Sequence, residues 1–304
     1  MKVFSFFVML LTAFSASAVT PLEVQQLTPN VYALVGEMEQ RSDANLANNA
    51  TFGVIVTESG VVLIDPGGSY RGAQQIDDAI KTLTDKPVTM VINSGGQDHR
   101  WIGNGYFKQR GARLVASAAA VADHKARSRD QIIALQNFLS EENMQSTELV
   151  FADETFEEEK SLHIGGVDIE LQRVGPAHTP GDTLIWLPQQ RIAFAGDVVY
   201  VERMLGVGSM SNSRQWLEAF EALSALQPRW VVPGHGHAVT LEKARAETYD
   251  YLVFLRQEVG KMIDEGIGME KVGEIDQSRF SHLKVYEQIK GRNAQQVYTE
   301  MEWE

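Results

Sequence analysis

Four short apolar segments, each followed by a polar loop rich in glycine, constrain this chain more than any other feature. An apolar segment of this kind is typical of a buried β-strand. The loops that follow are residues 93–104, 175–182, 196–197 and 233–237. Functional groups in α/β proteins gather in such loops at strand ends. We therefore expect the four loops to converge on one site.

The order of the elements predicts the fold class. Strands, a helix, a strand and a helix occur in the first half, and the same order follows in the second. The expected strands are residues 31–35, 52–56, 61–64, 88–92, 114–116, 162–164, 167–174, 183–187, 192–195 and 230–232, and the expected helices lie near 73–83, 117–139, 216–226 and 241–262. Thr240 is a suitable N-cap for the last helix. This order indicates an α/β (α+β) protein, a four-layer αββα sandwich, with residues 19–304 as a single domain.

The composition excludes several classes of protein. The 304 residues carry a formal net charge of −13, which disfavours nucleic acid and anionic membrane surfaces as partners. The chain contains no cysteine, so a metal must be held by histidine, carboxylates or weaker ligands. The acidic segment 141–160 is typical of a solvated connection.

The N-terminus has the pattern of a secretory signal peptide. Lys2 is followed by an apolar run over 3–14, and Ala16-Ser17-Ala18 is a typical cleavage site. A buried N-terminal helix is the alternative. We predict removal of residues 1–18 and export of the mature chain to a bacterial periplasm. No later stretch is long and apolar enough to span a bilayer.

Three side chains at the strand ends are candidates for chemistry. His178 lies between two Gly/Pro turns, Asp197 follows a strand and a glycine, and His235 follows Pro233-Gly234. A turn or helix-capping role is the alternative for Asp197. Asp182 is expected to fix the turn that holds His178.

These motifs, together with Ile64-Asp65-Pro66-Gly67 and the loop 93–104, resemble those of the metallo-β-lactamase superfamily of metal-dependent hydrolases. The resemblance covers nearly all of residues 19–304. Among the members, the chain is most similar to exported zinc metallohydrolases associated with periplasmic quinoprotein systems. It implies the metallo-β-lactamase fold, with Asp65 either orienting a ligand from behind or forming a turn.

The metal-binding loop departs from the family pattern Asn-Thr-His-x-His-x-Asp-His-x-x-Gly-Asn. Asn93-Ser94 and Gly103-Asn104 match its two ends. Between them, Gly95 and Gln97 stand in place of the first two histidines. His99 replaces the aspartate, and Arg100 replaces the third histidine.

The resemblance therefore implies that the first metal site retains only His178 and the weak ligand Gln97. The second site retains His99, Asp197 and His235, which suit one Zn²⁺ or Fe²⁺. Asp98 is a further ligand if the loop shifts by one residue.

The remaining groups have several expected roles. Asp98 or His178 is expected to transfer a proton. Arg100 is expected either to hold an anionic substrate group or to pair with Asp197 in place of a metal charge.

Two functions remain open. One is a mononuclear metallohydrolase acting on a small-molecule substrate. The other is a metal-poor relative that serves as a binding protein or a partner of another protein. A true β-lactamase is a third alternative, because antibiotic cleavage is only one of many activities in the superfamily.

Overall fold

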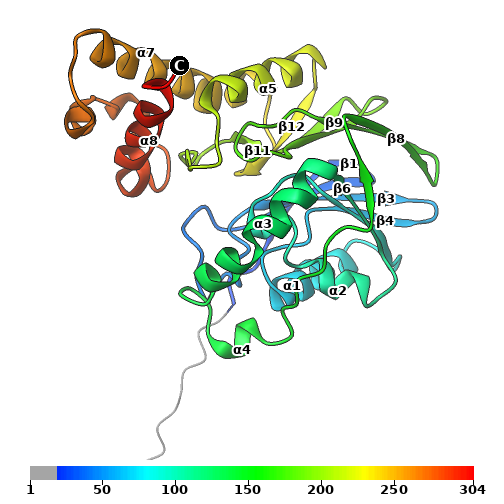
Figure 1. Ribbon diagram of the computed structural model, residues 1–304. Coiled ribbons are helices and arrows are strands. Elements are labelled where there is room, and N and C mark those ends of the chain that lie inside the picture. Colours follow the sequence, from blue (N-terminus) through cyan, green and yellow to red (C-terminus); the bar gives the residue numbers. More distant parts are fainter. Residues whose placement is uncertain (1–18) are drawn as a thin grey trace, which may run out of the picture.

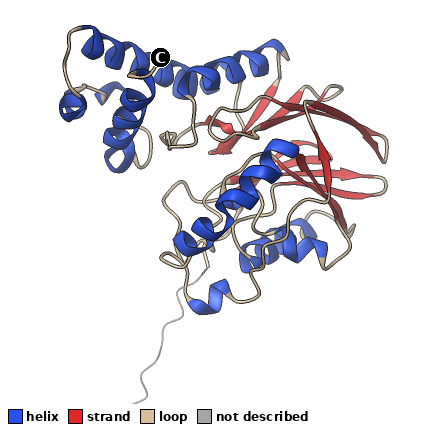
Figure 2. Cartoon of the chain, viewed as in Figure 1, coloured by secondary structure: helices blue, strands red, loops and turns tan. Residues whose placement is uncertain are grey.

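Two β-sheets pack face to face between two layers of helices in the computed structural model, which describes residues 19–304 (Figures 1 and 2). The expected αββα sandwich is confirmed. The predicted signal peptide, residues 1–18, lies outside the described residues. Within the described part of the chain, no helix combines the length and apolar character needed to cross a membrane.

The first sheet has the strand order β1-β2-β3-β4-β5-β6-β7. Its strands are β1 (Glu23–Thr28), β2 (Val31–Val35), β3 (Thr51–Thr57), β4 (Gly60–Ile64), β5 (Val88–Asn93), β6 (Arg113–Ser117) and β7 (Glu154–Phe156). β1 to β4 pair antiparallel, whereas β4 to β7 pair parallel. The carboxyl ends of β4 and β5 therefore lie side by side, which places Asp65 next to the loop that follows β5.

The second sheet has the order β12-β11-β10-β9-β8. Its strands are β8 (Glu159–Ile164), β9 (Val167–Arg173), β10 (Thr183–Leu187), β11 (Ile192–Tyr200) and β12 (Trp230–His235). Only β11 and β12 pair parallel, so both end at the same edge of the sheet. That edge carries the loops with His178 and His235.

Helices cover the outer face of each sheet (Figure 1). The first sheet carries α1 (Tyr70–Lys81), α2 (Asn104–Lys108), α3 (Ala118–Leu135) and α4 (Glu141–Met144), and the short helix η1 (Asp98–Arg100) lies in the loop after β5. The second sheet carries α5 (Ser213–Ala225), α6 (Leu241–Ala244), η2 (Arg245–Tyr249), α7 (Asp250–Asp264), η3 (Met269–Glu274), η4 (Ser278–Phe280) and α8 (Tyr286–Met301).

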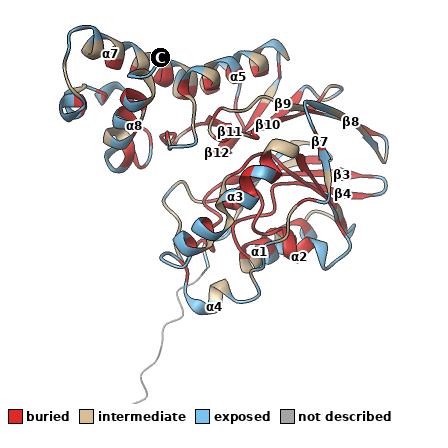
Figure 3. Ribbon diagram, viewed as in Figure 1, coloured by how far each residue is buried: buried red, intermediate tan, exposed pale blue. Residues whose placement is uncertain are grey.

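The core lies mainly between the sheets and under the two helical layers (Figure 3). Alternate side chains of the first sheet, such as Ile55 and Ile92, pack against Leu171 and Phe194 of the second. Buried helix residues pack on the opposite face of each sheet. Both faces of the central strands are thus covered, which explains their continuous apolar runs.

Two strands continue beyond the predicted ends. β11 was expected to stop at Ala195, but it bulges at Gly196 (φ +49°) and runs on to Tyr200. A Cβ on Gly196 would collide with the Ser94 hydroxyl. β12 continues through Pro233-Gly234 to His235, although these residues predict a break. Parallel pairing with β11 compensates for the weak strand propensity of both residues.

Other elements differ in detail. β1 and β7 were not predicted, and the acidic segment 141–160 contains α4 and β7 as well as solvated turns. The long helix predicted over 241–262 is built from α6, η2 and α7 in succession, with a π-helical turn at η2. Thr240 caps it as expected, because its hydroxyl accepts the backbone N–H of Lys243.

Candidate metal centre and its cavity

The loop after β5 is fixed at both ends by a reciprocal amide pair. Asn93 Nδ2 donates to Asn104 Oδ1 and Asn104 Nδ2 donates to Asn93 Oδ1, each at 3.0 Å. Asn93 also donates to the Arg100 carbonyl at 2.8 Å. A side chain at Gly103 would collide with the Pro66 carbonyl. These contacts explain why both ends of the family's motif are present while its centre differs.

Arg100 is fully buried, and protein atoms satisfy all of its donors. Its Nε and Nη2 contact the two carboxylate oxygens of Asp197 at 3.1 and 2.8 Å. Nη1 donates to Asp65 Oδ2 at 2.9 Å and the Thr51 carbonyl at 3.1 Å, and Nη2 also donates to the Gly234 carbonyl at 2.8 Å. A guanidinium has five N–H groups, so none remains for a ligand. The predicted substrate contact of Arg100 is therefore wrong, whereas its pairing with Asp197 is present.

The two carboxylates around Arg100 differ in their acidity. Burial raises the pKa of Asp65, although Arg100 and the backbone and hydroxyl of Ser94 oppose this shift. Asp197 is also buried, yet Arg100 and His99 hold its pKa well below its usual range. Asp197 is thus ionised at neutral pH. Asp65 orients the loop after β5 and Arg100 from behind, as the sequence suggests.

His99, Asp197 and His235 meet beside Arg100. Their ligand atoms lie within 4.8 Å of one another and all three residues are buried. His99 Nε2 is 3.4 Å from Asp197 Oδ2, and His235 Nε2 is 3.3 Å from Asp197 Oδ1. The bulge at Gly196 directs Asp197 from β11 toward this point. Within residues 19–304 this is the one group of three or more histidines and carboxylates close enough to share an ion.

Asp98 and Arg41 surround the other ring nitrogen of His99. Arg41 Nη2 lies 3.0 Å from His99 Nδ1, and Asp98 Oδ1 lies 3.1 Å from the same atom. Arg41 also pairs with Asp98 directly. Burial raises the pKa of Asp98, but Arg41 and His99 lower it by more, so the net shift is downward. This carboxylate is therefore a poor proton acceptor. Its contacts orient His99, and the predicted proton transfer through Asp98 is not supported.

His178 reaches the same centre from the loop after β9. Its Nδ1 is 3.7 Å from Asp197 Oδ2, and its Nε2 is 3.4 Å from the hydroxyl of Tyr200. Burial lowers the pKa of His178 to about 4, so the ring is neutral at pH 7. Asp182 holds the loop as predicted, because it accepts the Thr179 hydroxyl at 2.5 Å and the Thr179 N–H at 2.7 Å.

Protein atoms fill the space that the family's first histidine ligand would occupy. A Cβ at Gly95 would lie 2.5 Å from Asp182 Oδ1. His124 Nε2 contacts the Gly95 carbonyl at 2.9 Å, and Thr179 Oγ1 accepts the N–H of Gly96 at 2.9 Å. A histidine at position 95 therefore has no room in this arrangement. The family's first histidine ligand is thus absent from the sequence, and the packing around Gly95 leaves no space for it.

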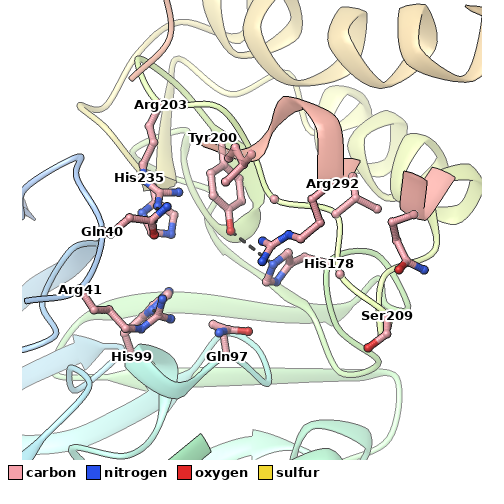
Figure 4. Close-up of a pocket in the computed structure, with 15 residues that line it drawn as sticks. Gln40, Arg41, Gln97, His99, His178, Tyr200, Arg203, Ser209, His235 and Arg292 are labelled. Atoms are coloured by element: carbon pink, nitrogen blue, oxygen red, sulfur yellow. Dashed lines mark hydrogen bonds between the residues drawn. The ribbon is translucent and has the colours of Figure 1, made fainter. Parts of the chain in front are cut away.

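A cavity of about 420 Å³ opens onto the centre (Figure 4). His99, His178 and His235 line its inner end, and Gln97 lies at its edge. Tyr200 stacks on His235, with the ring centroids 4.5 Å apart. Asp98 and Arg100 do not line this cavity. The remaining lining residues are Gln40, Arg41, Arg203, Gly206, Val207, Gly208, Ser209, Ile289, Arg292 and Gln296.

Several lining residues were missed in the sequence. Arg41 lies in a polar loop, Arg203 follows β11 and Arg292 lies on α8, so no local motif links them. Tyr200 could have been found, since it ends the same apolar strand that carries Asp197.

Comparison with known proteins agrees with this geometry. The sequence profile described as "Metallo-beta-lactamase superfamily" matches residues 47–235. The chain therefore belongs to the metallo-β-lactamase superfamily. A metallo-beta-lactamase type 2 of Elizabethkingia meningoseptica is 23% identical over 218 residues, which cover 70% of this chain and 78% of that protein.

Two solved structures share the fold. A metallo-beta-lactamase from Pontibacter korlensis superposes with a TM-score of 0.61 at 22% identity, covering 76% of this chain and 98% of that one. A sec-alkylsulfatase from Pseudomonas sp. gives 0.70 at 16% identity over 91% of this chain, which spans half the length of that enzyme. At this identity the likeness defines the fold alone.

Proposed function

We propose that this protein is a metal-dependent hydrolase with one metal ion, held by His99, Asp197 and His235. The observation that carries the proposal is the convergence of these three buried side chains, of which His99 and His235 line the cavity. Membership of a superfamily that includes metal-dependent hydrolases supports the reaction class. The curated relatives it matches bear the name metallo-beta-lactamase.

The donor atoms fit one ion. His99 Nε2 is buried, has no hydrogen-bond partner among residues 19–304 and lies 3.4 Å from Asp197 Oδ2, and His235 Nε2 lies 3.3 Å from Asp197 Oδ1. Arg100 occupies only part of the hydrogen-bonding capacity of the Asp197 carboxylate, since each oxygen has two lone pairs. Two imidazoles and a carboxylate suit Zn²⁺ or Fe²⁺.

The surrounding residues define the chemistry. A bound Zn²⁺ or Fe²⁺ would supply Lewis acidity and an activated water. Asp98 Oδ1 can accept a hydrogen bond from His99 Nδ1, which would fix the ring with Nε2 free to bind. His178 is neutral and borders the cavity, so it has a lone pair that can accept a proton there, and its pKa of about 4 makes it a weak base. Burial, with Asp197 nearby, raises the pKa of Tyr200 well above its usual value and keeps its hydroxyl a donor.

Metal analysis tests the proposal. The purified chain is loaded with Zn²⁺ or Fe²⁺, dialysed and measured by mass spectrometry. We expect about one equivalent in the wild type and a large loss in His99→Ala and His235→Ala. His163→Ala is the matched control, because the exposed His163 lies on β8 outside the cavity. Less than about a tenth of an equivalent in the wild type contradicts the proposal.

A metal-poor binding protein is the second candidate, and one observation favours it. The guanidinium of Arg100 already places a permanent positive charge against Asp197, on both oxygens. If the wild type holds no metal and hydrolyses none of a panel of carboxylic, phosphoric and sulfuric esters and a chromogenic β-lactam, this candidate replaces the first. Cleavage of the β-lactam alone would instead favour a true β-lactamase.

We also propose that the chain is exported and processed after Ala18. The support is the sequence of residues 2–18. N-terminal sequencing of protein recovered from a periplasmic fraction tests this. A mature N-terminus at Val19 is the expected result, and an intact Met1 in the cytoplasmic fraction contradicts it.

A further inference from the structure

The cavity carries three arginines, in contrast to the acidic character of the chain as a whole. The chain has 40 acidic and 27 basic residues. None of the acidic residues lines the cavity, whereas Arg41, Arg203 and Arg292 do. They come from the loop after β2, the segment after β11 and α8. Three distant parts of the chain therefore bring the same charge to one opening.

Arg203 is a buried cation without a carboxylate partner within the described chain. It is 6% exposed. Its Nε donates to the Met38 carbonyl at 2.9 Å and its Nη2 to Gln40 Oε1 at 3.2 Å, and both acceptors are neutral. Burial and the nearby Arg41 lower the pKa of Arg203, while Tyr200, Asp197 and Glu39 oppose this shift without forming an ion pair with it. Buried charges normally have a counter-charge, so this guanidinium is incomplete without an anion.

Arg292 adds a second positive charge to the cavity from an exposed position on α8. Its guanidinium forms neither a hydrogen bond nor an ion pair with any residue between 19 and 304. It extends from α8 into the cavity near His178 (Figure 4). Gly206 lies beside this guanidinium, since a Cβ at that position would be in van der Waals contact with Nη2 at 3.5 Å. Arg41, in contrast, is neutralised by Asp98.

We propose that Arg203 and Arg292 form an anion subsite that binds a compact oxyanion of the substrate: a carboxylate, sulfate or phosphate group. Guanidinium groups bind such oxyanions through paired, charge-assisted hydrogen bonds. His99 and His235 line the same cavity, and the two arginines lie on either side of Tyr200 (Figure 4). That the bound molecule is hydrolysed rests on the proposed function. The anion subsite itself does not.

Anion binding by the full mature chain in EDTA tests the subsite without relying on metal or activity. The probes are inorganic sulfate, inorganic phosphate and acetate, titrated by calorimetry at constant ionic strength. We expect saturable binding of at least one probe, weakened about tenfold or more in Arg203→Gln and in Arg292→Gln. The probe bound most tightly identifies the head group.

Arg129→Gln is the matched control, because Arg129 is exposed on α3 and the substitution removes the same charge. It is expected to bind like the wild type. Arg203→Lys, which retains the charge, is expected to bind more tightly than Arg203→Gln, and circular dichroism checks that each variant is folded.

Two results overturn the subsite. One is no binding by the wild type up to about 50 mM of every probe, a weaker affinity than a specific site would give. The other is equal binding by Arg129→Gln and both cavity variants, which would mean that anions bind elsewhere. Anion binding without any metal uptake would retain the subsite and reject the proposed hydrolase. Metal uptake without anion binding would do the reverse.

Discussion

At the scale of single residues, the contacts of Arg100 hold Asp65 and Asp197 in place at this site. Arg100 occupies a position where the family pattern has a metal-binding histidine, yet it makes no contact with the cavity. Its five hydrogen bonds join Thr51 and Asp65 of the first sheet to Asp197 and Gly234 of the second. The sequence predicted a positive charge at this position. The acceptors that its N–H groups contact could not be predicted, because they depend on how the two sheets pack.

Replacing Arg100 is expected to destabilise the protein strongly. Arg100→Met removes the cation and leaves Asp65 and Asp197 buried together without it. We expect a loss of about 3–5 kcal/mol in the free energy of unfolding, measured by urea denaturation. Arg129→Met, at an exposed position, is expected to change it by less than about 0.5 kcal/mol. A similar value for both variants would show that Arg100 is not the central contact.

Restoring the family's histidine at position 95 is expected not to restore the first metal. The new side chain would overlap Asp182, which holds the His178 loop. We expect Gly95→His to lose about 1–3 kcal/mol of stability, as overpacked sites do, and to gain no metal. Urea denaturation and metal analysis of the same sample test both statements. A second equivalent of metal would contradict the steric argument.

The buried His124 makes stability depend on pH. Burial lowers its pKa from 6.5 to about 4, and the ring stacks on Trp101. Between these values the unfolded chain binds a proton that the native chain does not, so this contribution to stability is complete above pH 6.5 and is lost toward pH 4.

His124→Gln is expected to reduce the slope of stability against pH over that window, by at most about 1.4 kcal/mol per pH unit. Urea denaturation from pH 4 to 8 measures it. Other buried histidines add slopes of their own, so the comparison with the wild type is the relevant quantity. Above pH 7 the two slopes should coincide. An unchanged slope at low pH contradicts the prediction.

At the scale of elements, α8 shapes the cavity from outside the region matched by the family profile, residues 47–235. Asn293 is fully buried on this helix. It accepts the Val207 N–H at 2.8 Å and donates to the Leu205 carbonyl at 2.8 Å and the Tyr251 hydroxyl at 3.0 Å. The segment after β11 is thereby fixed against α8, and Arg203 and Arg292 are brought to one opening.

Asn293→Ala is expected to leave these three polar groups without their partner and to cost about 2–4 kcal/mol. It should also weaken anion binding, because Arg292 and the segment that carries Arg203 lose their common support. Asn137→Ala removes one exposed hydrogen bond and is the control for both measurements. Loss of stability with unchanged anion binding would show that the contacts of Asn293 on α8 are not needed to position the anion subsite.

The elements also show what the sequence could predict. The strand ends that carry His99, Asp197 and His235 were recognisable because apolar runs and glycine turns are local signals. The family motif then indicated which of these residues could meet. The bulge at Gly196 and the continuation of β12 were not predictable, since pairing between β11 and β12 overrides local propensity. The arginines of the cavity lie too far apart in the chain for any periodic pattern to connect them.

At the scale of the whole molecule, the proposed metal ligands lie on both sheets. His99 follows β5, whereas Asp197 and His235 belong to β11 and β12. A bound ion would cross-link the two halves and stabilise the native state by mass action. We expect Zn²⁺ at about 100 times its dissociation constant to add about 2.7 kcal/mol to the free energy of unfolding. His235→Ala should abolish the gain, and an equal gain in that variant would assign the ion to another place.

The five hydrogen bonds of Arg100 have a consequence for the stability of the protein without a bound metal. Unlike a metal ion, a guanidinium cannot be removed by a chelator, and it keeps its charge at every physiological pH. The hydrogen bonds and ion pairs of Arg100 therefore join the two sheets in the folded chain without a metal. If the chain takes up a metal ion as proposed, the two sheets would stay joined through Arg100 when the metal is scarce, and metal supply would then regulate activity more than the amount of folded protein.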